Sequence, residues 1–136
     1  MRQKRVLTYG TFDLLHHGHI RLLRRAAELG DTLIVGLSTD EFNAQKNKAA
    51  FYPFEVRREI LEAVRYVDSV FPEQTWEQKR GDIARFQIDI VAMGDDWAGD
   101  PRFESLRDLC EVVYLTYTPG ISTTDVKTRL RNQPPN

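Results

Sequence analysis

The sequence predicts an α/β protein, a Rossmann-like three-layer α/β/α sandwich with a five-stranded parallel sheet. Five short apolar runs of strand length alternate along the chain with segments of helical periodicity. Strands that alternate with helices form parallel sheets, and their right-handed crossovers cover both faces of the sheet. No internal repeat, low-complexity segment or linker interrupts the 136 residues. We therefore expect residues 1–136 to form a single domain.

The strands are expected where apolar and β-branched residues run together between glycine, proline or polar turn residues. The first run ends at Gly10, and the second follows a Gly30-Asp31 turn. The fourth ends abruptly at Gly94. In order, the predicted strands cover residues 6–9, 32–37, 68–72, 88–93 and 112–115.

The helices are expected between these strands, each with an apolar stripe or a capping residue at its start. Pro53 suits the first turn of the third helix. Ser122 or Thr123 is expected to cap the last helix. In order, the predicted helices cover residues 18–29, a short segment capped by residues 38–41, and then 54–66, 76–86, 103–109 and 122–130. Residues 131–136 are expected to be a disordered tail.

The junction between the first strand and the first helix contains all three histidines of the chain, in the sequence His16-His17-Gly18-His19. A helix start offers unpaired N–H groups and a positive dipole end, which together form an anion site. Gly18 permits close approach of a phosphate to the backbone. Two other interpretations, incidental surface histidines and a metal site, are less favoured because the histidines cluster so closely and no HExxH pattern or nearby cysteine accompanies them. The motif therefore indicates phosphate chemistry.

In a parallel sheet, the segments that follow the strands meet at one edge, where ligands bind. Four unusual segments follow strands in this way. They are the histidine segment and residues 38–48, 94–97 and 116–124. We expect all four to contribute to one site.

The composition excludes several classes of partner. The net charge of −1 gives no overall attraction to nucleic acid or to an anionic membrane. No apolar run has the length of a signal-peptide core or a membrane span, so we expect no membrane insertion. The single cysteine fits a reducing compartment, and a cytoplasmic location is expected.

Several motifs give the chain a resemblance to a known family. The segments TYGTFDLLHHGH, STDEFNAQKNK, WEQK, MGDDW and GISTT resemble those of the glycerol-3-phosphate cytidylyltransferases, which belong to the HxGH nucleotidyltransferases. The resemblance runs from about residue 6 to residue 130. It implies transfer of CMP from CTP to glycerol 3-phosphate, giving CDP-glycerol and pyrophosphate. It also implies Mg²⁺ bound with CTP, a homodimer, and a product that feeds a wall or capsule polymer.

The resemblance assigns roles to individual residues. The catalytic residues are His16, His19, Lys46 and Lys48. The nucleotide would contact Thr11, Phe12, His16, His17, Gly18, His19, Lys48, Asp96, Tyr117, Thr118, Gly120, Ile121, Ser122, Thr123 and Thr124. The acceptor would contact Lys46, Lys79, Asp13 and Arg57, and no residue of the chain is expected to be a metal ligand.

The chemistry explains why such residues are needed. An acceptor phosphate oxygen attacks the α-phosphorus in line while pyrophosphate leaves, so a covalent enzyme intermediate is not expected. The site must align two polyanions and stabilise developing negative charge, which suits imidazole, ammonium and amide donors. Asp13 either caps the helix or orients a histidine, and Arg57 is either structural or close to substrate. Asp96 would accept from the cytosine amino group, cap the following turn or support a metal ion.

Two positions depart from the family pattern. The family reads RTEGISTT where residues 117–124 read YTPGISTT, so Tyr117 replaces an arginine and Pro119 a glutamate. Tyrosine offers one neutral hydrogen bond instead of a charged fork. Either another cation such as Arg102 or Arg129 covers the triphosphate, or CTP binds more weakly. A cytidylyltransferase or adenylyltransferase for another phosphorylated polyol or alcohol, and a non-catalytic nucleotide-binding subunit, are the alternative functions.

Overall fold

The sheet is parallel throughout, with the strand order β3-β2-β1-β4-β5. The structure is a computed structural model that describes residues 2–117 and 122–133. The strands are β1 (Arg5–Gly10), β2 (Thr32–Ser38), β3 (Ser69–Glu73), β4 (Ile90–Gly94) and β5 (Glu111–Leu115). The predicted fold class is confirmed, and each predicted strand lies within two residues of its observed bounds.

The predicted helices are also present, with differences at their ends. They are α1 (His17–Ala27), α2 (Asp40–Gln45), α3 (Phe54–Glu62), α4 (Lys79–Arg85), α5 (Pro101–Glu104) and α6 (Thr123–Asn132), with 3₁₀ turns η1 (Asp95–Trp97) and η2 (Ser105–Asp108). Helix α4 begins later than predicted because the Gln78 side chain accepts the N–H groups of Gln74 and Thr75 and holds a turn before it. Helix α6 continues to Asn132, so the first two residues of the predicted tail are helical.

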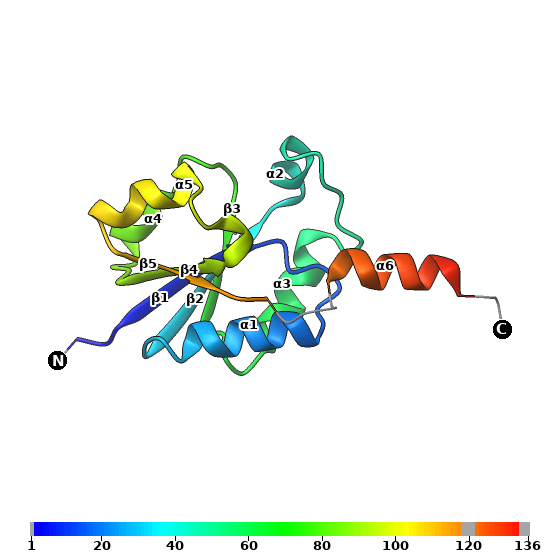
Figure 1. The fold of residues 1–136 in the computed structure, drawn as a ribbon, viewed down its shortest axis with the longest axis horizontal. Helices are drawn as coiled ribbons and strands as arrows, with labels where there is room; N and C mark the ends of the chain where they lie inside the picture. Colours follow the sequence, from blue (N-terminus) through cyan, green and yellow to red (C-terminus); the bar gives the residue numbers. More distant parts are fainter. Residues whose placement is uncertain (1, 118–121, 134–136) are drawn as a thin grey trace.

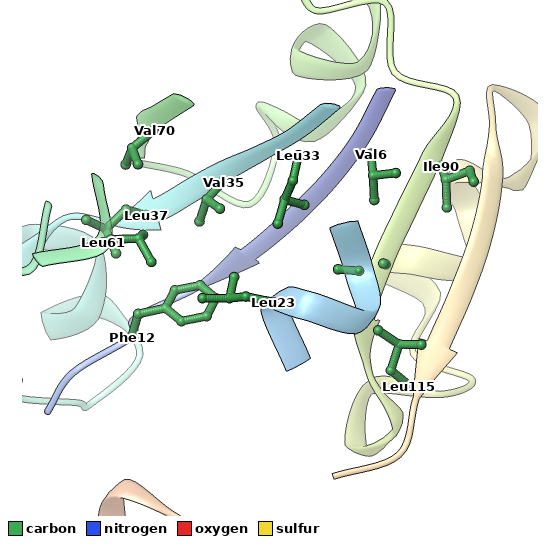
Figure 2. Packing of buried hydrophobic residues seen from close by; sticks show 12 residues of the cluster. Val6, Phe12, Leu23, Leu33, Val35, Leu37, Leu61, Val70, Ile90 and Leu115 are labelled. Atoms are coloured by element: carbon green, nitrogen blue, oxygen red, sulfur yellow. The ribbon is translucent and has the colours of Figure 1, made fainter. Parts of the chain in front are cut away.

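Helices cover both faces of the sheet, as the alternation of strands and helices predicts (Figure 1). On one face, α1 and α3 pack against a cluster of strand residues (Figure 2). On the other face, α4, α5 and η2 pack against the alternate strand residues. Thus in β1 Val6 belongs to the first cluster and Leu7 to the second. Strands buried on both faces explain why their sequences read as continuous apolar runs.

Helix α6 differs from the other helices because it extends away from the sheet (Figure 1). It lies beyond the carboxyl ends of the strands, and none of its residues is fully buried. Among the described residues, no helix has both the length and the apolar character that crossing a lipid bilayer would require.

Arg57 of α3 joins the segments that follow β1 and β2. Its side chain is buried, and its Nη1 donates to the carbonyl oxygens of Thr11 at 2.9 Å and Ser38 at 2.8 Å. Its Nε donates to the Tyr52 carbonyl, and its Nη2 to the Asp40 carboxylate. Arg57 was expected near the acceptor, or in a structural role. With most of its N–H groups used within the protein, it is a structural connector of the carboxyl edge rather than a substrate ligand.

Replacing Arg57 is expected to destabilise the fold. The variant Arg57→Met keeps the apolar stem but leaves three buried carbonyl groups without donors, which should reduce the free energy of unfolding by about 3 kcal/mol or more. Arg57→Lys should recover little, because an ammonium cannot reproduce the planar fork. Urea denaturation measures both. Arg58→Met, at the more exposed next position, should cost less than about 1 kcal/mol. Equal losses at the two positions would contradict this role for Arg57.

Candidate active site

The first turn of α1 is capped by two of the motif's own imidazoles. His16 is the N-cap residue, and its Nδ1 accepts the Gly18 N–H at 3.1 Å. His19 reaches back, and its Nδ1 accepts the His16 N–H at 3.0 Å. The two rings lie 3.9 Å apart between centroids. The sequence therefore builds a capping box from histidines, where serine and glutamate are the usual pair.

These hydrogen bonds determine which ring nitrogens carry hydrogen. Because Nδ1 of each histidine accepts a backbone N–H, the neutral ring must carry its hydrogen on Nε2. Burial, together with the nearby charge of His16, lowers the pKa of His19 to about 4. Burial, together with His17, also lowers the pKa of His16. At neutral pH both residues are therefore uncharged and present an Nε2–H donor. The Nε2 of His16 is buried and has no hydrogen-bond partner among the described residues.

The start of α6 faces these donors. The Thr123 Oγ1 lies 3.5 Å from the His19 Nε2 and donates to the Asp13 carbonyl at 3.0 Å. Ser122 caps α6 by accepting the Asp125 N–H. A cavity of about 560 Å³ lies between the two helix starts, and its lining residues are His16, Gly18, His19, Leu22, Lys48, Asp96, Tyr117, Ser122, Thr123 and Thr124. The predicted convergence of the histidine segment with residues 122–124 is thus observed.

A second, polar cavity of about 350 Å³ adjoins the first, and both are lined by His19, Lys48, Thr123 and Thr124. Thr11, Phe12, Asp13 and Lys127 also line it. The hydroxyl of Thr11 lies 3.0 Å from the Asn43 side-chain oxygen, and the buried ring of Phe12 packs below His19. Phe12 has a φ of +48° and Leu14 one of +49°, so this loop is held in a backbone conformation that such residues rarely adopt. Backbone strain of this kind is common where a segment is shaped around a ligand.

Asp13 holds three segments together at this cavity. Its buried carboxylate accepts the N–H groups of Phe51 at 2.6 Å and Tyr52 at 3.0 Å, and it lies 3.4 Å from the Lys127 ammonium. Burial alone would raise the pKa of Asp13, but these partners outweigh it and hold the pKa below its usual value. Asp13 was expected to cap α1, to orient a histidine or to contact the acceptor. Its carboxylate instead orders the loop before α3.

The predicted lysines occupy three different environments. Lys48 is exposed and lines both cavities. Lys46 lines neither cavity; its ammonium lies 4.4 Å from the centre of the Phe42 ring and donates to the Ser38 hydroxyl at 3.1 Å. Burial, reinforced by neighbouring cations and opposed by Glu73, lowers the pKa of Lys46 to about 8. Lys79 is only 2% exposed and donates to Glu73 at 2.7 Å, so in this arrangement its ammonium is not open to a substrate.

The lining of the first cavity also includes Asp96 and Tyr117. The Tyr117 phenol lies against Gly94 and fills the space that a Cβ at this position would need. Burial and the Asp96 carboxylate raise the pKa of Tyr117, so the phenol remains neutral. His17, by contrast, is exposed, and it is absent from the lining of both cavities. Thr118, Gly120 and Ile121, which were also expected to bind the nucleotide, lie outside the described residues.

Neither cation suggested as a substitute for the missing arginine lines these cavities. The Arg102 guanidinium lies 3.9 Å from the centre of the Trp76 ring and pairs with Asp100, while Arg129 is exposed on α6. The cation of α6 that lines the polar cavity is Lys127, which the sequence reasoning missed. One signal for it was present, because Lys127 follows Thr123 by four residues on a predicted helix and so shares its face.

The low histidine pKa predicts a pH-dependent stability. Between the usual pKa of 6.5 and about 4, the unfolded chain binds a proton at His19 that the folded chain excludes, so the free energy of unfolding falls as the pH is lowered through this window. Between pH 7 and pH 4.5 the free energy of unfolding should fall by roughly 2 kcal/mol more in the wild-type chain than in His19→Gln. Urea denaturation at the two pH values measures this difference. Parallel pH curves for wild type and His19→Gln would argue against a neutral, buried His19.

Comparisons with known proteins identify relatives of this chain. A family model described as cytidylyltransferase-like matches residues 7–129. The glycerol-3-phosphate cytidylyltransferase of Bacillus subtilis is 60% identical over 124 residues, which cover 91% of this chain and 95% of that protein. Its counterpart in Staphylococcus aureus is 58% identical, over 93% of this chain and 95% of that protein.

More distant relatives share the fold. An FAD synthase of Pyrococcus abyssi is 40% identical over 85% of this chain and 82% of its own length. The solved structure of a lipopolysaccharide core biosynthesis protein from Thermoplasma volcanium superposes with a TM-score of 0.76 at 23% identity, covering 86% of this chain and 99% of that one. With the family model matched over most of its length, the chain belongs to the cytidylyltransferase-like family.

Proposed function

We propose that this protein transfers CMP from CTP to glycerol 3-phosphate, giving CDP-glycerol and pyrophosphate. The observation that carries the proposal is the cavity lined by both His16 and His19, in which the His19 Nε2 lies 3.5 Å from the Thr123 hydroxyl at the start of α6. Such an arrangement of uncharged donors, lysines and helix N-termini suits a triphosphate. The similarity to proteins named glycerol-3-phosphate cytidylyltransferase supports the choice of both substrates.

The proposed reaction is a direct displacement. An oxygen of the acceptor phosphate forms a bond to the α-phosphorus, and the bond from that phosphorus to the bridging oxygen breaks on the opposite side. Electrons of the breaking bond leave with pyrophosphate, and no covalent enzyme intermediate forms. His16 and His19 would donate from Nε2 to the α-phosphate and bridging oxygens, where negative charge grows. Because the acceptor is already an anion, the neutral histidines have no proton to remove.

The lysines and hydroxyls would align the two anions. Lys48 lies between the two cavities and is proposed to contact the triphosphate, with Ser122, Thr123 and Thr124 at the start of α6. Lys127 is proposed to contribute a second charge on the same side, in the absence of the arginine that Tyr117 replaces. Asp96 and Tyr117 would contact the nucleoside. Lys46 is proposed to bind the acceptor phosphate.

Mg²⁺ is proposed to enter with CTP. Among residues 2–117 and 122–133, no group of three or more histidine, cysteine or carboxylate side chains has the spacing of a metal site. Of the carboxylates that line the cavities, Asp13 is occupied by two backbone N–H groups and Lys127. The ion would be held by phosphate oxygens, with Asp96 as the other carboxylate that lines the cavities, and would neutralise part of the triphosphate charge. We place the reaction in the cytoplasm, as the single, half-buried cysteine suggests.

Removal of either donor histidine should slow turnover. His16→Ala and His19→Ala are each expected to lower kcat by about 10²-fold or more, the scale of losing one donor to a developing charge. Pyrophosphate release in the presence of CTP and glycerol 3-phosphate measures the rate. His17→Ala, changed at the same helix start but exposed, serves as the control and should remain within about threefold of wild type.

The same assay separates the proposed reaction from its alternatives. CDP-glycerol should form from CTP and not from ATP, and other phosphorylated polyols should give lower kcat/KM. Release of pyrophosphate only with ATP, or only with another acceptor, would reassign the substrate. CTP binding by calorimetry with no turnover on any acceptor would indicate a non-catalytic nucleotide-binding protein. An unchanged rate in His16→Ala or His19→Ala would remove that histidine from the mechanism.

We also propose that the chain forms a homodimer through the apolar surface between α6 and the loop before α3. Phe51 is 69% exposed and Leu130 is 62% exposed, and both line a cavity of about 560 Å³ with Leu14 and Tyr52. A ten-residue helix with no fully buried residue is marginal by itself. A second copy of the chain would cover these side chains and support α6. Because Lys127 lines both this surface and the polar cavity, dimer formation would also steady the nucleotide site.

Analytical ultracentrifugation tests the dimer. Leu130→Asp should weaken dimer formation by at least about tenfold, because it would bury an unpaired charge in the interface. Leu109→Asp, at an exposed leucine after η2, is the matched control and should leave the association unchanged. A monomer at high micromolar concentration, or equal effects of the two substitutions, would contradict this interface.

A further inference from the structure

A buried chain of hydrogen bonds connects two lysines through one carboxylate. Lys46 Nζ donates to the Ser38 hydroxyl at 3.1 Å, and the Ser38 hydroxyl donates to Glu73 Oε1 at 3.0 Å. Lys79 Nζ donates to the other carboxylate oxygen, Glu73 Oε2, at 2.7 Å. Ser38 and Glu73 end the paired strands β2 and β3, and Cα register sets them side by side. The fold therefore places this chain at the carboxyl edge of the sheet.

The direction of the hydrogen bonds follows from the charges. A carboxylate only accepts, so the hydrogen of the Ser38 hydroxyl points toward Glu73. The lone pairs of that hydroxyl are then directed to Lys46. Glu73 thereby orients the Ser38 hydroxyl, whose oxygen accepts a hydrogen bond from the Lys46 ammonium, although Glu73 does not contact Lys46 itself.

The two ends of the chain are enclosed to different extents. Glu73 and Lys79 are each about 2% exposed, and the Lys79 ammonium lies 4.6 Å from the centres of both the Tyr9 and Trp76 rings. Lys46 is only partly buried, between the rings of Phe42 and Trp76. A buried charge needs a counter-charge, and Lys79 supplies it for Glu73. With one carboxylate for two ammonium groups, the excess positive charge remains on Lys46, the end that reaches solvent.

We propose that Glu73 is a positioning residue for the acceptor substrate: paired with Lys79 and linked through Ser38 to Lys46, it keeps Lys46 fixed and positively charged to receive the acceptor's phosphate. Lys79 is then the counter-ion that prevents Glu73 from cancelling the charge of Lys46. In this arrangement Lys79 acts through Glu73 instead of contacting the substrate. The inference rests on the proposed function for the identity of the acceptor, but not for the charge of Lys46.

Every charged group that influences Lys46 belongs to a different element. Glu73 at the end of β3 favours the ammonium form. Lys79 of α4, Lys48 after α2 and Arg57 of α3 oppose it, as does burial against the aromatic rings. The protonation of Lys46 near pH 8 is therefore the balance of one carboxylate against three cations and partial dehydration.

Two substitutions should change this balance in opposite directions. Glu73→Gln keeps the size of the side chain but removes its charge, so the titration midpoint of Lys46 should fall by about one pH unit or more. Lys79→Met removes the counter-ion and leaves Glu73 to Lys46 alone, so the midpoint should rise. NMR titration of isotopically labelled lysine in the full chain, without substrate, measures both midpoints. General damage to the fold would not produce shifts of opposite sign.

The kinetic effect of Glu73→Gln should be confined to the KM for the acceptor substrate. With a midpoint one unit lower, the protonated fraction of Lys46 at pH 8 falls about fivefold, so the KM for glycerol 3-phosphate should rise about fivefold in Glu73→Gln. The KM for CTP should stay within about twofold of wild type. Asp82→Asn is the matched control, because this buried carboxylate of α4 accepts from Tyr9 and Gln78 and not from either lysine.

The outcomes separate this inference from the proposed function. Unchanged Lys46 midpoints in the folded variants, shifts of the same sign, or an equal shift in Asp82→Asn would overturn the role of Glu73. Because the two variants are predicted to shift in opposite directions, either one alone tests the inference if the other does not fold. Opposite shifts together with a wild-type protein that does not use glycerol 3-phosphate would support the effect of Glu73 and Lys79 on the charge of Lys46. They would reject glycerol 3-phosphate as the acceptor.

Discussion

The reciprocal capping of α1 by His16 and His19 is the interaction on which the site depends. Each imidazole satisfies a backbone N–H at the helix start with its Nδ1, which leaves its Nε2–H for a ligand. The hydrogen bonds that form the start of the helix therefore also orient the two donors. Since a free imidazole interconverts its two tautomers, this local geometry removes an ambiguity that a binding site would otherwise have to resolve.

The site separates neutral from charged donors. Burial keeps the two histidines uncharged, and the positive charge comes from Lys46 and Lys48 at the end of α2 and from Lys127 of α6. The acidic groups nearby are occupied within the protein: Asp13 by backbone N–H groups and Glu73 by Lys79. The result is a polar edge that favours anions although the whole chain carries a net charge of −1. Local arrangement, rather than composition, creates the field that a substrate would meet.

Buried polar residues hold this edge in place. Arg57 ties the segments after β1 and β2, Asp13 orders the loop before α3, and Glu73 joins the ends of β2 and β3 to α4. Each of them gives buried polar groups hydrogen-bond partners within the protein in place of water, because burying such groups without partners costs free energy. Such residues look like substrate ligands in a sequence, because charged side chains near a motif suggest contact with an anion. In the structure they support the residues that line the cavities.

The sequence by itself determined the strand and helix order, the parallel sheet and the meeting of the histidine segment with the start of α6. These follow from periodicity, capping residues and the rule that parallel strands end at one edge, all of which are local or topological. It also singled out His16 and His19 by the clustering of all three histidines at one helix start, and Lys48 and Thr123 through the family resemblance of their motifs. Only the tertiary structure decided that Arg57, Asp13 and Lys79 turn inward, that Lys46 rests on Phe42 while Lys127 lines a cavity, and that the histidines are neutral. Those outcomes depend on burial and on partners distant in the chain, which a linear pattern does not contain.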